Sequence, residues 1–109
     1  MPTTYKVLGQ VAPSATTATT LETAPAATQV VISTISVCNR AATAATYRIA
    51  VRPAGATLAN EHYIAYDATV AANNTTFITV GITLAATDVV TVYASTANLS
   101  FSAFGTEIS

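Results

Sequence analysis

Short runs of β-branched or alternating residues, separated by turn residues, occupy most of the chain. The densest run, residues 30–38, is rich in valine and isoleucine, which favour extended backbone. The run 47–52 alternates large apolar residues with charged or small ones, the pattern of a half-buried strand. The same criteria predict further strands, at residues 5–11, 62–70, 75–82, 89–94 and 99–104.

The number and spacing of these runs predict the fold class. Turn residues recur at fairly regular intervals, and no segment has the period of an amphipathic helix. We therefore expect an all-β protein, an antiparallel β-sandwich of about seven to eight short strands, either immunoglobulin-like or jelly-roll-like. Residues 1–109 are expected to form one domain, with residues 1–4 as a loose N-terminal arm. Residues 12–20 are expected to be a flexible connection or a weak edge strand.

Alternation along each predicted strand assigns its side chains to faces. In the run 30–38, bulky residues fall on both faces near the start, which predicts a central strand covered on both sides. In the run 62–70, strict alternation places Tyr66 and Val70 on one face. Threonine-rich strands carry little charge, so we expect poorly protected sheet edges that pair or are covered in an oligomer.

Five residues are candidates for an interaction surface. Arg48 and Arg52 share the polar side of their strand, and Tyr63 and Asp67 share one side of the following strand. Arginine and tyrosine are enriched at protein interfaces, so these side chains would form one patch if the two strands are neighbours. Tyr66 is the fifth candidate. A solvated face with an Arg–Asp ion pair is an alternative of equal weight.

The charge composition limits the kinds of partner. Charged residues make up 8% of the chain, against roughly 25% in typical soluble domains, and the net charge is −1. This balance argues against a nucleic-acid module and gives no electrostatic reason to bind an anionic membrane. A charge-poor surface does little to keep copies apart, so it favours a protein whose surface is covered in an assembly.

No run approaches the roughly 18 apolar residues of a membrane helix. The N-terminus lacks a signal-peptide core, so we expect synthesis in a cytoplasm.

No arrangement of reactive residues predicts catalysis. Cys38 and His62 are the only residues of their types, and the five carboxylates include no pair at strand spacing. A thiol dyad of these two residues would lack any oxyanion-hole motif, and Cys38 is expected to be a small buried hydrophobe. Nucleotide-binding and nucleophile-elbow motifs are absent from the sequence. We therefore predict no catalytic, metal or cofactor site, and a protein that is not an enzyme.

Four stretches carry a family resemblance: VCN at 37–39, TYRIAVRP at 46–53, HYIAYD at 62–67 and TDVVTVYAS at 87–95. They are similar to stretches in short virion structural proteins of tailed bacteriophages, including cyanophages. The resemblance covers most of residues 28–109 and, weakly, the N-terminal part. The chain departs from the family at residues 21–25, so the resemblance gives no support for a strand there.

The resemblance implies a non-enzymatic component of the virion, made in the host cytoplasm. The expected role is a capsid decoration or cement protein that self-associates, as a trimer by analogy with lattice threefolds, and binds the major capsid protein or tail proteins. Arg48, Arg52, Tyr63 and Tyr66 are the expected contacts. The alternative is a tail, neck, baseplate or fibre component that binds a receptor or glycan.

Overall fold

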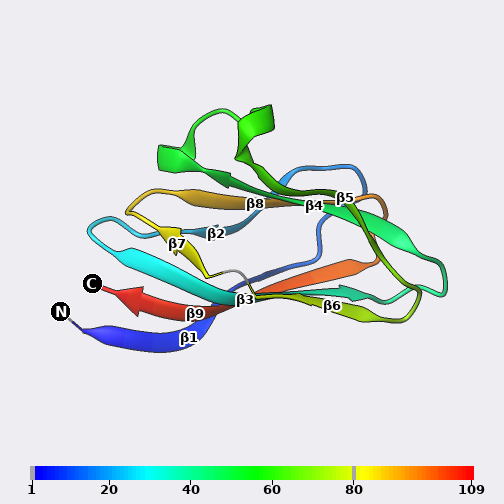
Figure 1. Ribbon diagram of the computed structural model, residues 1–109, viewed down its shortest axis with the longest axis horizontal. Helices are drawn as coiled ribbons and strands as arrows, with labels where there is room; N and C mark the ends of the chain where they lie inside the picture. The colour runs from blue at the N-terminus through cyan, green and yellow to red at the C-terminus, as the bar shows by residue number, and fades with distance from the viewer. Residues whose placement is uncertain (1, 80) are drawn as a thin grey trace.

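The computed structural model describes residues 2–79 and 81–109, and it confirms the predicted all-β sandwich (Figure 1). The described residues form nine strands and two single-turn 3-10 helices. In chain order these are β1 (Thr3–Val11), β2 (Thr19–Thr23), β3 (Gln29–Asn39), β4 (Ala45–Arg52), η1 (Pro53–Gly55), η2 (Asn60–His62), β5 (Tyr63–Val70), β6 (Thr75–Ile78), β7 (Ile82–Leu84), β8 (Val89–Ala94) and β9 (Leu99–Ile108).

The strands form two antiparallel sheets that pack face to face. Sheet I has the order β1-β9-β3-β6, with β7 also paired to β3, and sheet II has the order β2-β8-β4-β5. The chain is thus a long hairpin rolled on itself: β4 pairs with β5, β3 with β6 and β7, β2 with β8, and β1 with β9. The pairs β3–β9 and β4–β8 then close the two sheets. This is the double Greek key of a jelly roll, one of the two sandwich types expected.

The core lies between the sheets and is built from the alternating inward residues of both. Phe101 of β9 packs edge-to-face on Tyr47 of β4, with ring centroids 6.3 Å apart, and so joins the two sheets. Such pairs add to the free energy that area burial already provides. Leu21 of β2 is also buried, so the segment without family support is a strand that closes the core.

β-bulges account for two face assignments that were wrong. In β3, Ile32 and Thr34 pair with consecutive residues of β9, so Ser33 is an extra residue and the inward face switches there. β3 is central in its sheet, but its outer side is open, because Ser33 is exposed. In β5 the register also shifts, and Asp67 has φ 52°. Val70 therefore points inward, whereas Tyr66, expected on the same face, is exposed.

The chain ends and the sheet edges also differ from expectation. Thr3 and Thr4 lie in β1 and pair with β9, so the ordered strand begins inside the arm expected at residues 1–4, of which Met1 lies outside the described residues. Residues 12–18 form a connection before β2. The edges are better protected than the low charge predicts. β1, β2 and β5 each carry a register shift, and β6 and β7 are short.

Candidate interaction surface

The outer side of sheet II carries a cluster of one arginine, one aspartate and three tyrosines, which we call the Arg48 cluster. The guanidinium of Arg48 on β4 lies over two rings, with its Cζ 4.1 Å from the ring centroid of Tyr66 on β5 and 4.3 Å from that of Tyr93 on β8. Tyr63 packs edge-to-face on Tyr66, with centroids 4.9 Å apart. The cluster therefore spans three neighbouring strands.

Asp67 holds the guanidinium in this position. Arg48 donates from Nε to Oδ1 of Asp67 at 2.7 Å and from Nη2 to Oδ2 at 3.4 Å. This hydrogen bond is the main cause that raises the pKa of Arg48 above its ordinary value, so the charge is permanent. The bulge in β5 gives Asp67 its left-handed backbone, which aspartate tolerates better than most residues.

The cluster is ordered yet accessible. The side chain of Arg48 is 23% exposed and that of Asp67 is 46% exposed, while Tyr66 is 57% exposed. A guanidinium fixed between two rings loses little conformational entropy on binding, and arginine and tyrosine are the residue types that dominate binding energy at interfaces. The geometry is therefore that of a preorganised contact surface.

Four of the five predicted contact residues meet in this cluster, and Arg52 does not. Arg52 donates from Nε to Thr91 Oγ1 at 3.0 Å and from Nη1 to the carbonyl oxygens of Gly55 and Ala56 at 3.3 and 2.9 Å. These contacts tie η1 to sheet II, above which both 3-10 helices lie in Figure 1. Tyr93 is the member that sequence reasoning missed, because nothing in the run 89–94 shows which strand lies beside it.

The reactive side chains lie apart from one another. His62 accepts a hydrogen bond at Nδ1 from the backbone N–H of Ala59 at 3.0 Å and so stabilises η2. Cys38 is half-buried on the outer side of sheet I, contrary to the buried position expected, while His62 lies beside sheet II. Asp88 accepts from the backbone N–H groups of Ala54 and Ala85 at 2.8 and 2.9 Å and so stabilises the turn before β8. Within residues 2–79 and 81–109, no three His, Cys, Asp or Glu side chains are grouped to hold a metal.

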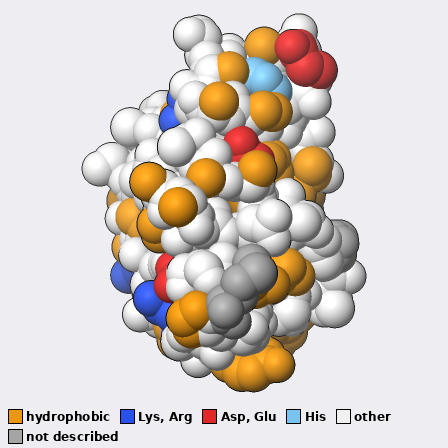
Figure 2. All heavy atoms as spheres, turned by 90° about the vertical axis from the view of Figure 1, so that its left-hand side faces the viewer, with side chains coloured by type: hydrophobic (Ala, Val, Ile, Leu, Met, Phe, Trp, Pro, Cys, Tyr) orange, Lys and Arg blue, Asp and Glu red, His pale blue; other side chains and the backbone are white. Residues whose placement is uncertain are grey.

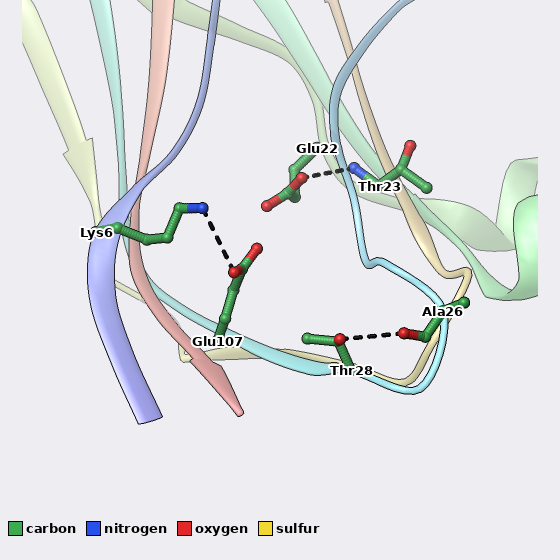
Figure 3. A network of polar contacts seen from close by, with 6 residues as sticks. All are labelled: Lys6, Glu22, Thr23, Ala26, Thr28 and Glu107. Carbon is green, nitrogen blue, oxygen red and sulfur yellow. Dashed lines mark hydrogen bonds and ion pairs between the residues drawn. The ribbon is translucent and has the colours of Figure 1, made fainter. Parts of the chain in front are cut away.

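Two carboxylates meet at the margin between the sheets, as Figure 3 shows. Glu107 of β9 pairs with Lys6 of β1 at 3.4 Å, and Glu22 of β2 points toward this pair. Oε1 of Glu22 accepts from the N–H of Thr23 at 2.8 Å, whereas Oε2 is buried without a hydrogen-bond partner among the described residues. Burial raises the pKa of Glu22, and the charge of Glu107 raises it further. Sequence spacing could not show this approach, because the two residues lie on distant strands.

A cavity of about 470 Å³ opens between the sheets beside β5. The described residues that line it are apolar apart from one threonine: Ile49, Val51, Ile64, Ala65, Ile78, Ile82 and Thr83. None of these side chains is ionisable, so the lining supplies neither an acid nor a base.

No helix among the described residues is long and apolar enough to cross a membrane.

Comparison with protein-family models, with curated proteins and with solved structures finds no match for this chain.

Proposed function

We propose that the chain is a non-enzymatic structural protein of a tailed-bacteriophage virion, a capsid decoration or cement protein that self-associates and stabilises the particle. The observation that carries the proposal is the Arg48 cluster, an exposed and preorganised arginine–tyrosine surface on a rigid sheet. The resemblance of residues 37–39, 46–53, 62–67 and 87–95 to phage virion proteins supports it. A jelly roll also suits this role by analogy, because viral capsid domains use the same architecture.

The Arg48 cluster would bind a capsid protein through both apolar and polar contacts. Arg48 uses Nε and Nη2 for Asp67, which leaves the N–H donors of Nη1 for a carbonyl or carboxylate of the partner. The exposed ring of Tyr66 supplies apolar area beside these donors. The tyrosine rings already cover part of the guanidinium and interact favourably with its charge. The desolvation penalty when a partner buries Arg48 is therefore smaller than the penalty for a free arginine.

Cosedimentation of the purified chain with virions that lack it tests the proposal. The wild-type chain should bind, and Arg48→Ala and Tyr66→Ala should each weaken binding by at least about tenfold, the effect of removing an interface hot spot. Arg40→Ala is the matched control. It removes the same charge from the connection after β3, where Arg40 contacts the carbonyl oxygen of Ala97, and should change binding less than about twofold.

Absence of wild-type binding, or equal weakening by the Arg40 and Arg48 variants, would contradict the proposal.

A receptor- or glycan-binding role on the tail is the second candidate, because the exposed ring of Tyr66 lies beside the polar groups of Arg48 and Asp67. It predicts that the isolated chain binds a glycan and that Tyr66→Ala abolishes this binding. Retention of capsid binding without glycan binding would exclude it.

A further inference from the structure

The outer face of sheet I carries no charged side chain among the described residues. The alternation of burial along β9 points Phe104 outward, and Val7 of β1 lies directly opposite it. Tyr5 lies two residues before Val7 and so falls on the same side of β1. Phe77 of β6 points outward at the far side of the sheet, opposite Ser36. The other outward positions include threonine, serine, glutamine and valine, together with the half-buried Cys38. We call this surface the sheet I face.

The sheet I face exposes large hydrophobic side chains. Tyr5 is 82% exposed, Phe77 68%, Val7 48% and Phe104 37%. Figure 2 shows hydrophobic side chains at the lower end of the molecule, the side on which Figure 1 places sheet I. Monomeric proteins rarely leave such a surface free of charge, because nothing on it opposes association.

The charged side chains lie elsewhere. Lys6, Glu22 and Glu107 are gathered at the margin between the sheets, and Arg48 and Asp67 lie on the outer side of sheet II. The remaining four lie at the end of β4, in η2 or in the connections between strands. Among the described residues, none of the charged side chains therefore lies on the sheet I face.

The edges of the sheets are poor alternatives for association. β1 has a register shift between Val7 and Gly9 and directs Lys6 toward the margin between the sheets. β2 has five residues and its own register shift, and β5 has two shifts and carries Asp67. Bulges, short strands and charges are the devices that prevent edge pairing, so they direct association to a face.

We infer that two copies of this chain associate through the sheet I face, packed face to face about a two-fold axis. A charge-free face fits a second copy of itself, because neither copy buries an unpaired charge, whereas a charged partner surface would be desolvated without compensation. One patch that opposes itself is an isologous contact and closes as a dimer, unlike the trimer expected from the resemblance by analogy with lattice threefolds. The inference rests on the proposed function only for the premise that the chain works in several copies.

The size of the face is sufficient for such a dimer. Four strand positions about 4.8 Å apart, and the length of β9 at about 3.3 Å per residue, give a face of about 19 Å by about 33 Å. This is roughly 600 Å² per copy, the lower end of the range for specific interfaces, which start at about 1,200 Å² for both partners together. The expected dimer is therefore weak enough to depend on concentration.

Sedimentation velocity of the purified full chain tests the inference at concentrations up to about 100 µM, well above the micromolar dissociation constants of weak interfaces. The mass should approach twice the 11.1 kDa of one chain. Thr34→Lys places a charge beside Phe104 on the sheet I face, and the dimer should dissociate. Thr20→Lys is the matched control on the outer side of sheet II and should leave the mass unchanged.

Tyr5→Lys is the second variant. Because Tyr5 is 82% exposed, the substitution does not disturb the core, and loss of the dimer then reports on the face and not on folding. A wild-type monomer at the highest concentration, a trimer, or a dimer that survives both Thr34→Lys and Tyr5→Lys would overturn the inference. A monomer that still binds virions would overturn the dimer alone, whereas a dimer that binds no virion would overturn only the proposed function.

Discussion

Replacement of Phe101 by alanine tests the packing of the two sheets. Phe101 is 1% exposed, is the third residue of β9 and contacts Tyr47 of the opposite sheet. Removal of a buried phenylalanine ring costs about 3–5 kcal/mol in transfer free energy and residual cavity. A domain of this size changes its melting temperature by about 4–8 °C per kcal/mol. Phe101→Ala should therefore lower the melting temperature by roughly 12 °C or more.

Phe104→Ala is the matched control on the same strand. Phe104 lies three residues further along β9 and faces outward at 37% exposure, so its removal should cost less than about 1 kcal/mol. Thermal unfolding followed by circular dichroism, at a concentration where copies do not associate, compares the two variants. Equal destabilisation by both substitutions, or a larger effect of Phe104→Ala, would refute the assignment of the inner and outer sides of sheet I.

Three further predictions concern single residues. Burial raises the pKa of Glu22 above its ordinary value near 4.5, so the folded state holds the proton more tightly than the unfolded state and stability falls as pH rises through this window. Glu22→Gln should remove this slope and raise the melting temperature at neutral pH, and an unchanged slope in thermal melts would contradict it. A Cβ at Gly105 would overlap the carbonyl oxygen of Val31, so Gly105→Ala should force β3 and β9 apart and cost about 1–3 kcal/mol in urea unfolding; a neutral effect would contradict this packing. Arg52→Ala should release η1, seen as faster amide hydrogen exchange at residues 54–56, and unchanged exchange there would show that Arg52 does not hold it.

Most strands were predictable from sequence because their signal is local, but the single strand predicted at residues 75–82 was wrong, because β6 ends at Ile78 and β7 begins at Ile82. Runs of β-branched residues predicted the position of β3, and alternation predicted the inward side chains of β4. The inner and outer sides of β3 and β5 were not predictable, because one extra residue at Ser33 and the bulge at Asp67 reverse the alternation. Bulges depend on pairing with a partner strand, which the local pattern does not contain.

The candidate site was predictable in part for a similar reason. Arg48 and Asp67 were assigned to one patch on the condition that their strands are neighbours, and β4 and β5 do pair. Tyr93 belongs to the cluster because β8 pairs with β4 on its other side, an arrangement set by the closure of the jelly roll. Its register with Arg48 is a property of the whole fold, so no stretch of sequence could supply it.

The most direct test of the proposed role is electron cryomicroscopy of purified tailed-phage virions that, on the proposal, contain the chain. The proposal predicts many copies over the head, with the Arg48 cluster against a capsid protein. A particle that lacks the chain, or one that carries only a few copies at the tail, would contradict it.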